Sequence, residues 1–210
     1  MRRYDLSWTG STVIGMELKV PKQRFSVAEY LERERKAVDK HEYRDGEILL
    51  MAGGSRSHSL MIANVIAALH SRLQGKPCRV YDSNLRVQVP RKVLYTYPDV
   101  SVICGQSDPD ENDPAGDTVT NPRLIVEVLS DSTEAYDRGK KFDGYRELES
   151  LQEYVLVSQE APRVETFFRQ PDGTWLLTPV SGLNASVRLR SIETEVALAA
   201  IYQGVEFPAA

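Results

Sequence analysis

Two segments of the sequence each carry one acidic residue in a run of hydrophobic residues. Asp99 lies in residues 97–103, and Glu127 lies in residues 123–129. Both segments have the composition of buried strands, where a carboxylate costs free energy unless a partner compensates it. Two such carboxylates on neighbouring strands, followed by a helix with basic residues, predict a hard metal ion held beside a lysine. Such a site is typical of metal-dependent phosphodiester hydrolysis.

The lysine of such a site has to come from outside the Glu127 strand. Side chains alternate along a strand, so Leu129 faces the same way as Glu127, and no lysine follows two residues on. In the helix expected next, successive residues are about 100° apart, which places Lys141 on the core-facing side and Lys140 well away from it. That side also carries Phe142, Tyr145 and Leu148. We therefore expect Lys141 to be the catalytic lysine, with Asp137 four residues earlier orienting it.

The composition is that of an ordinary soluble protein. The 210 residues carry a formal net charge of -4, which argues against a nonspecific polyanion binder but permits a local basic groove. No apolar run approaches the roughly 20 residues that span a bilayer, so no membrane partner is expected. A chain of this length fits one domain, which we place at residues 25–210 after an N-terminal arm of residues 1–24. Met16 is an alternative start.

The sequence contains two cysteines, Cys78 and Cys104. They lack the spacing of a zinc site, and two isolated cysteines do not predict a disulfide framework. We therefore expect a protein of the reducing cytoplasm.

Periodicity and turn signals predict a mixed α/β (α+β) fold, in which helices flank a mixed β-sheet core and a C-terminal hairpin is added. Helices are expected at residues 26–38, 58–74, 131–148 and 192–203, and capping-box patterns open the first and third. Strands are expected at residues 42–51 with a turn at 45–46, 78–89 with a bend at 82–84, 97–103, 123–129 and 154–157, followed by the hairpin 164–177. Residues 105–121 are polar and acidic, so we expect a mobile loop or lid that shields the site.

Several short motifs together resemble a known family. They are Glu42-Tyr43, Asp45-Gly46-Glu47, His58, Tyr97-Pro98-Asp99-Val100, residues 126–130, residues 137–141 and Tyr145. Over about residues 24–205 the chain resembles the Uma-type putative restriction endonucleases, a branch of the PD-(D/E)XK nuclease superfamily. The resemblance implies a restriction-endonuclease-like core and cleavage of DNA with Mg²⁺, for which Mn²⁺ could substitute.

The resemblance also assigns roles to individual residues. It makes Asp99, Glu127 and the Val128 carbonyl the metal ligands and Lys141 the residue that assists the nucleophile. Leu129 departs from the superfamily pattern, which implies that the lysine has moved to the helix. Because both strands of a duplex must be cut, a homodimer is expected.

Other residues are candidates for supporting roles. Glu47 is a further acidic candidate for the metal or its water, although an exposed Glu after a hairpin is common. His58 begins a helix, where a packed or capping histidine is frequent, and the resemblance favours a place beside the site. Ser130 is a candidate cap that also lies near a helix N-terminus suited to phosphate. Tyr145 is expected in the core with its hydroxyl near the site, and Arg86 and Arg138 are candidate phosphate contacts or ordinary surface charges.

Two other functions remain open from the sequence. Glu127 could belong to a buried ion pair with Arg86 or Lys141 in a noncatalytic module that binds DNA or protein. The acidic net charge is also compatible with a metal-dependent hydrolase of smaller phosphate esters.

Overall fold

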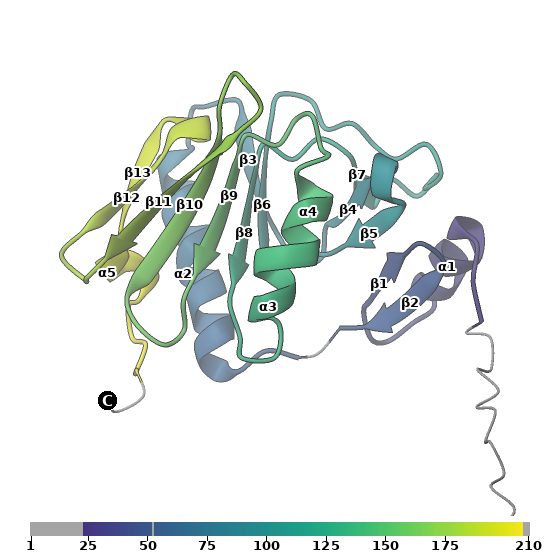
Figure 1. The fold of residues 1–210 in the computed structure, drawn as a ribbon, viewed down its shortest axis with the longest axis horizontal. Coiled ribbons are helices and arrows are strands. Elements are labelled where there is room, and N and C mark those ends of the chain that lie inside the picture. The colour runs from purple at the N-terminus through teal and green to yellow at the C-terminus, as the bar shows by residue number, and fades with distance from the viewer. Residues whose placement is uncertain (1–22, 52, 208–210) are drawn as a thin grey trace, which may run out of the picture.

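The computed structural model describes residues 23–51 and 53–207. Its main sheet has six strands in the order β11-β10-β9-β8-β6-β3 (Figure 1). The strands are β3 (Cys78–Asp82), β6 (Val100–Cys104), β8 (Leu124–Val128), β9 (Glu153–Val157), β10 (Arg163–Arg169) and β11 (Trp175–Ser181). β8 and β9 are parallel, and the other neighbours are antiparallel. The expected mixed sheet and the C-terminal hairpin β10–β11 are thus both confirmed.

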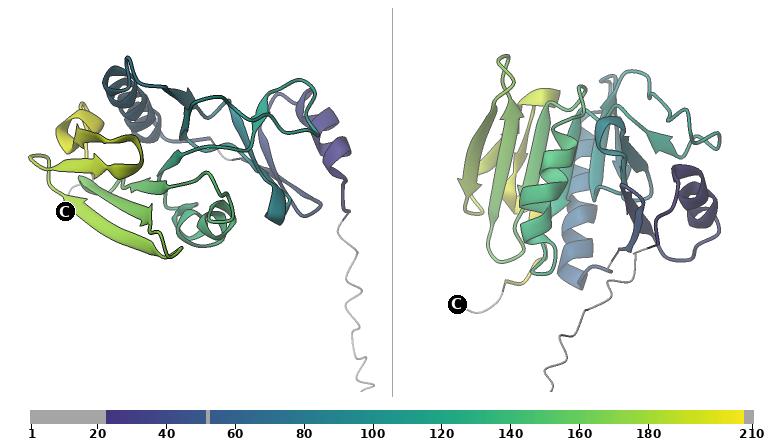
Figure 2. Two further views of the ribbon diagram at one scale, coloured as in Figure 1. Left: turned by 90° about the horizontal axis from the view of Figure 1, so that it is seen from above. Right: turned by 45° about the vertical axis from the view of Figure 1, so that its right-hand side comes forward.

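Helices cover both faces of this sheet (Figures 1 and 2). Val126 and Val128 of β8 belong to the core cluster that includes α2 (Arg56–Arg72), whereas Ile125 and Leu129 pack with the helical segment on the opposite side. That segment comprises α3 (Glu134–Tyr136), the π-helical turn η2 (Asp137–Lys141) and α4 (Phe142–Tyr145). Because strand side chains alternate, Glu127 faces the α3–α4 segment.

A second sheet lies beside the first, in the order β2-β1-β5-β4-β7. Its strands are β1 (His41–Arg44), β2 (Glu47–Leu50), β4 (Arg86–Val89), β5 (Leu94–Thr96) and β7 (Thr118–Val119). Helix α1 (Val27–Glu34) packs against it, and Ser26 and Glu29 form the expected capping box. The remaining elements are the 3-10 turns η1 (Pro90–Lys92) and η3 (Arg190–Ile192), the pair β12 (Ser186–Leu189) and β13 (Thr194–Ala197), and α5 (Leu198–Ile201).

Several local predictions were wrong. The expected strand 78–89 divides at its bend into β3 and β4, which belong to different sheets. The expected helix 192–203 is mostly β13 and α5, and the capping box at 131–134 does not form, because helix α3 begins at Glu134 after an uncapped Thr133. The expected arm, residues 1–24, including Met16, lies almost entirely outside the described residues.

The expectation of no disulfide was also wrong. Cys78 and Cys104 are directly opposite each other in the β3–β6 register, and they form a disulfide. The cysteine content therefore no longer supports a reducing cytoplasm, where structural disulfides are rare.

The acidic segment 105–121 is not a lid over the candidate site. It includes β7, and its Asp110 and Asp113 are buried against the second sheet. Asp110 accepts a hydrogen bond from Tyr95, and Asp113 forms ion pairs with Arg35 and Arg86. These buried contacts anchor the segment, so shielding of the site by a moving acidic loop is not supported.

The Asp113 anchor predicts a pH dependence of stability. Burial raises the pKa of Asp113, but hydrogen bonds from Thr118, Arg35 and Arg86 outweigh this and lower it from 3.8 to about 2. A carboxyl whose folded-state pKa is depressed stabilises the protein above its unfolded pKa, and this stabilisation is lost as the pH falls. Between pH 5 and pH 2 the wild type should therefore lose about 2 kcal/mol more unfolding free energy than Asp113→Asn. Urea denaturation at both pH values measures this difference, and equal losses in the two proteins would contradict it.

Candidate active site

Asp99 and Glu127 face each other across two neighbouring strands. β6 and β8 pair with Val100 opposite Val126, so Asp99, one residue before β6, lies opposite Glu127. The Val128 amide donates to Asp99 Oδ2 at 2.8 Å, and the Asp99 amide donates to Glu127 Oε2 at 3.3 Å. Each carboxylate is therefore positioned by the backbone of the other strand, and the two acids predicted from the sequence meet at one point.

The Lys141 ammonium lies among three buried carboxylates. Its Nζ is 2.9 Å from Glu127 Oε1, 3.5 Å from Asp137 Oδ1 and 3.6 Å from Glu42 Oε1. The Lys141 side chain is 6% exposed, whereas Lys140 is exposed to solvent, which is the orientation that the helical phase predicts. The strand thus has no lysine two residues after Glu127, and η2 instead places Lys141 beside Glu127.

This carboxylate cluster, formed by Glu42, Asp99, Glu127, Asp137 and Lys141, carries excess negative charge. Burial raises the pKa of Glu127, and Asp99 and Asp137 raise it further, while Lys141 lowers it. Burial lowers the pKa of Lys141, but the surrounding carboxylates outweigh burial and raise it well above its usual value. Lys141 is therefore held as a cation. It is the one basic side chain within this cluster of four acids, and His58 lies beside Asp99.

Glu42 is a member of the cluster that the sequence did not reveal as a functional residue. Its Oε1 accepts a hydrogen bond from Thr96, and its Oε2 accepts from the Tyr136 hydroxyl at 2.9 Å. The sequence offers Glu42 and Glu47 as the two acids of one hairpin. Glu47, the residue predicted from the sequence, lines a neighbouring pocket instead. The sequence did not predict strand β5, which covers Glu42. It therefore offered no reason to prefer Glu42 over Glu47 as the functional acid.

His58 lies beside Asp99 and Val128, the two residues that were predicted to bind the metal together with Glu127. Its Nε2 is 3.3 Å from Asp99 Oδ2, and the Val128 backbone lies close enough to raise the pKa of the ring. Burial lowers the pKa of His58, but Asp99 and Val128 outweigh it and raise the pKa. Gly54 leaves the room that this ring needs, because a Cβ at that position would lie 2.4 Å from His58 Nδ1. His58 thus holds the Asp99 carboxylate in place beside Val128.

The other sequence candidates divide into two groups. Tyr145 donates to Glu127 Oε1 at 3.0 Å, and Ser130 lines the pocket with its hydroxyl bonded to those of Ser132 and Thr133. Arg86 and Arg138 are elsewhere. Arg86 is buried and bonded to Asp113, and Arg138 pairs with Glu134 and Glu165 outside the pocket.

The cluster opens into a pocket of about 350 Å³, which we call the cluster pocket. Among the described residues, no group of three or more His, Cys, Asp or Glu side chains is arranged to hold a metal ion unaided. Asp99, Glu127 and the Val128 carbonyl nevertheless fit Mg²⁺, which takes one or two protein carboxylates and keeps several waters. The donors are hard oxygens, and the excess negative charge of the cluster favours a cation.

Comparison with known proteins decides the family. The model of the family Uma2, described as putative restriction endonuclease, matches residues 27–200. The chain belongs to the Uma2 family. Two uncharacterised Synechocystis proteins, slr1290 and sll1609, are each 38% identical to this Uma2 chain. The first match covers 89% of this chain and 96% of slr1290, and the second covers 77% and 90% of sll1609.

A solved structure supports the fold of this Uma2 protein. A putative nuclease belonging to DUF820 from Anabaena variabilis superposes with a TM-score of 0.65, covering 82% of this chain and 96% of its own, at 17% identity. The mixed α/β (α+β) fold class expected from the sequence is thereby confirmed, and the fold is similar to that of this neighbour. Within the described part of the chain, no helix combines the length and apolarity needed to cross a bilayer.

The buried position of Lys141 predicts a stability effect. Lys141→Met leaves three buried carboxylates without their cation, and removing one partner of a buried ion pair costs about 3–5 kcal/mol. The matched control is Lys140→Met, which removes the same charge from an exposed neighbour and should change stability by about 0.5 kcal/mol or less. Chemical denaturation at pH 7 compares the two variants. Equal stabilities would show that the Lys141 ion pairs do not hold the cluster together.

Proposed function

We propose that this Uma2 protein is a metal-dependent endonuclease that hydrolyses phosphodiester bonds in DNA. The observation that carries the proposal is the meeting of Asp99, Glu127 and Lys141 in one pocket, although Asp99 precedes β6, Glu127 belongs to β8 and Lys141 belongs to η2. The family description, putative restriction endonuclease, and the nuclease named among the structural relatives support the same reaction class.

In this proposal Asp99, Glu127 and the Val128 carbonyl hold Mg²⁺, with Mn²⁺ as a substitute. When bound, the ion would supply Lewis-acid activation of water and neutralise charge on the phosphate. The hydrogen bonds between the two strands keep the carboxylates oriented before the ion arrives. His58 contacts Asp99 Oδ2, so it acts as a positioning residue.

Lys141 acts through its charge and its hydrogen-bond donors. The carboxylates around it raise its pKa well above the usual value, so the proposal gives Lys141 the role of a hydrogen-bond donor and not that of a general base. Its ammonium can donate to an attacking water and offset the negative charge that develops on phosphorus oxygens. Glu42 and Asp137 fix the direction of this donor from two sides.

A homodimer completes the proposal. Cutting both strands of a duplex takes two sites, which a symmetric pair of chains supplies. Sedimentation of the purified protein with and without a duplex tests the dimer.

The metal ligands can be tested by isosteric substitution. Asp99→Asn and Glu127→Gln should each abolish Mg²⁺-dependent cleavage of plasmid DNA and remove the binding heat in isothermal titration with Mn²⁺, because each replaces a charged ligand oxygen. Circular dichroism should show an unchanged fold. Cleavage retained by both variants would rule out this assignment, and a wild type that binds no metal would favour a noncatalytic module. Parallel assays on a plasmid and on a small phosphate diester distinguish the DNA enzyme from a hydrolase of smaller esters.

Glu42 and Glu47 provide a matched pair in one hairpin. Glu42→Gln should reduce kcat by at least about tenfold. Glu42 helps to orient the Lys141 ammonium, and correct placement of such a charged hydrogen-bond donor contributes on the order of 10-fold or more to the rate. Glu47→Gln should retain cleavage and Mn²⁺ affinity within about twofold, because Glu47 lies outside the cluster pocket. The reverse ranking would restore Glu47 as the third acid of the site.

A further inference from the structure

A second pocket adjoins the cluster pocket. It has a volume of about 450 Å³, and Arg44 and Tyr136 line both pockets. The Tyr136 hydroxyl donates to Glu42 on the cluster side, and the Arg44 guanidinium lies 5.6 Å from the centre of the Tyr136 ring. Tyr136 is therefore a shared wall, and a molecule extending past it from the cluster would enter the second pocket. We call this second pocket the basic groove.

Most charges along the basic groove already have partners. Arg24 pairs with Asp45 at 3.3 Å, and Lys92 lies 3.8 Å from a Glu147 oxygen. Asp143 pairs with Arg146. Glu47 also lines the groove, opposite Arg44 in the β1–β2 register.

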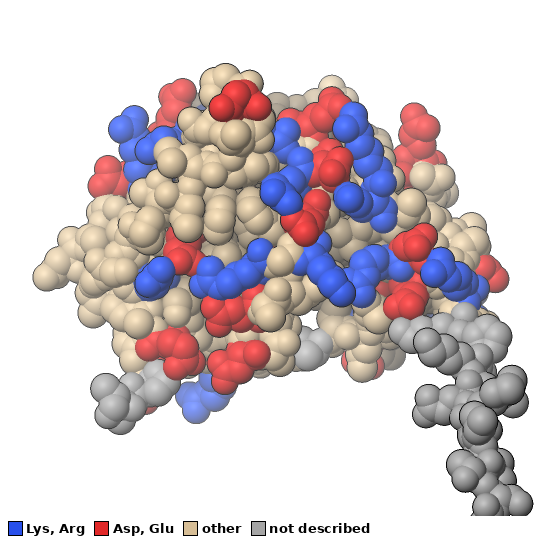
Figure 3. All heavy atoms as spheres, viewed as in Figure 1, with Lys and Arg blue, Asp and Glu red and all other residues tan. Residues whose placement is uncertain are grey.

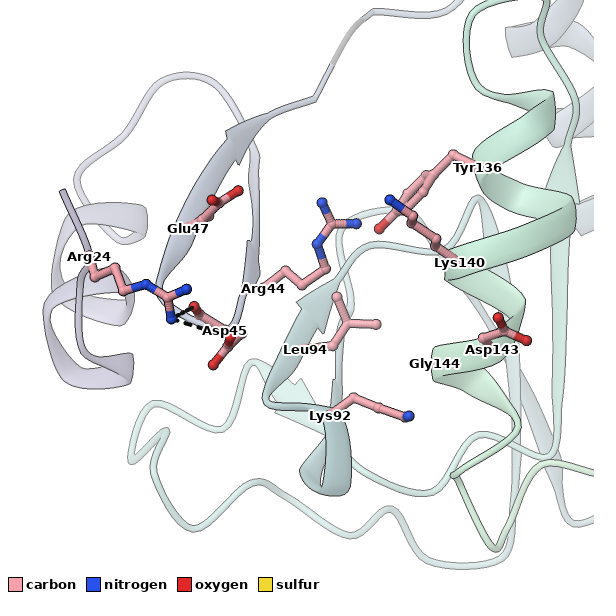
Figure 4. A pocket seen from close by; sticks show the side chains of 10 residues that line it. All are labelled: Arg24, Arg44, Asp45, Glu47, Lys92, Leu94, Tyr136, Lys140, Asp143 and Gly144. Carbon is pink, nitrogen blue, oxygen red and sulfur yellow. Dashed lines mark hydrogen bonds and ion pairs between the residues drawn. The ribbon is translucent and has the colours of Figure 1, made fainter. Parts of the chain in front are cut away.

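Arg44 and Lys140 differ from these residues. Neither forms an ion pair with a carboxylate of the described chain, and Figure 4 shows their charged ends directed toward each other beside Tyr136. Two cations that converge without an acid between them repel each other, and an anion placed between them would remove that cost. An anion placed between Arg44 and Lys140 would lie at the edge of the cluster pocket, because Arg44 lines both pockets.

Neighbouring basic side chains extend this position into a path. Figure 3 shows a row of Lys and Arg side chains across the middle of one face, over the α3–α4 segment and on toward β1, β2 and α1. A small phosphate ester would occupy one pocket only. A polymer with a phosphate at every residue can occupy the cluster pocket and the basic groove together.

We propose that Arg44 and Lys140 bind a backbone phosphate of a DNA strand, next to the phosphodiester positioned at Asp99 and Glu127. This proposal rests on the proposed nuclease function and adds the residues that hold its substrate. The consecutive residues Lys140 and Lys141 then have different tasks, because η2 directs one into the basic groove and the other into the cluster.

Fluorescence anisotropy with a fluorescein-labelled DNA duplex tests the proposal. The measurement is made in EDTA, so that neither cleavage nor metal binding contributes. Each lost phosphate contact should weaken binding about eightfold at 0.1 M monovalent salt, since affinity varies with roughly the 0.9 power of salt concentration per contact. Because both side chains contact the same phosphate, Arg44→Gln/Lys140→Gln should bind about eightfold more weakly, and the slope of log K against log salt should fall by about one.

The control is Lys36→Gln/Arg188→Gln, which removes two charges from exposed residues, one just after the end of α1 and one in β12, neither of which lines the groove. It should bind like the wild type, and the charge-conserving variant Arg44→Lys should retain most of the affinity. Thermal unfolding confirms that each variant is folded.

Three results would overturn the proposal. They are no binding by the wild type, equal binding by the two double variants, and complete displacement of the duplex by inorganic phosphate at matched ionic strength. The last result would indicate a site for a single phosphate. Failure of the nuclease assignment would appear separately, as absent Mn²⁺ binding and absent cleavage.

Discussion

A lysine and a glutamate that are buried together lose most of their hydration, and their mutual attraction offsets this loss only when further polar groups complete their hydrogen bonds. Lys141 and Glu127 meet this condition. Glu127 also accepts from the Tyr145 hydroxyl, and Lys141 also contacts Asp137 and Glu42. The pair is therefore stable only where the six-stranded sheet, the second sheet and the α3–α4 segment meet.

The apolar packing on that face of the sheet explains how such a polar cluster is tolerated. Phe142 follows Lys141 directly and stacks on Tyr154 of β9 with ring centres 4.8 Å apart. Tyr145, one turn later, is fully buried in the same core cluster. These contacts fix the rotation of the helical segment, so that the lysine has one orientation relative to the strands.

The sequence predicted the parts of the site that depend on local periodicity. Alternation in β8 gave the face of Glu127, and helical phase gave the inward direction of Lys141, because both depend only on near neighbours. Glu42 could not be found in this way, since its burial depends on Thr96 and Tyr136, which are distant in sequence. The same limit explains why the structural role of Arg86 was not predicted. Its partner Asp113 belongs to residues 105–121, whose polar and acidic composition predicted a mobile loop. The disulfide was missed because the β3–β6 register that places Cys78 opposite Cys104 is not a local property.

The π-helical turn η2 has a consequence for how Tyr136 and Lys141 share Glu42. In a continuous α-helix, residues five apart are rotated by about 140° from each other, so these two side chains would point in different directions. A π-helical turn closes its hydrogen bonds between residues five apart, which places them nearly one above the other. Lys141 Nζ accordingly lies 6.0 Å from the centre of the Tyr136 ring. One additional residue per turn thus aligns the wall of the basic groove with the lysine of the cluster, and the loss of one residue from η2 would rotate them apart.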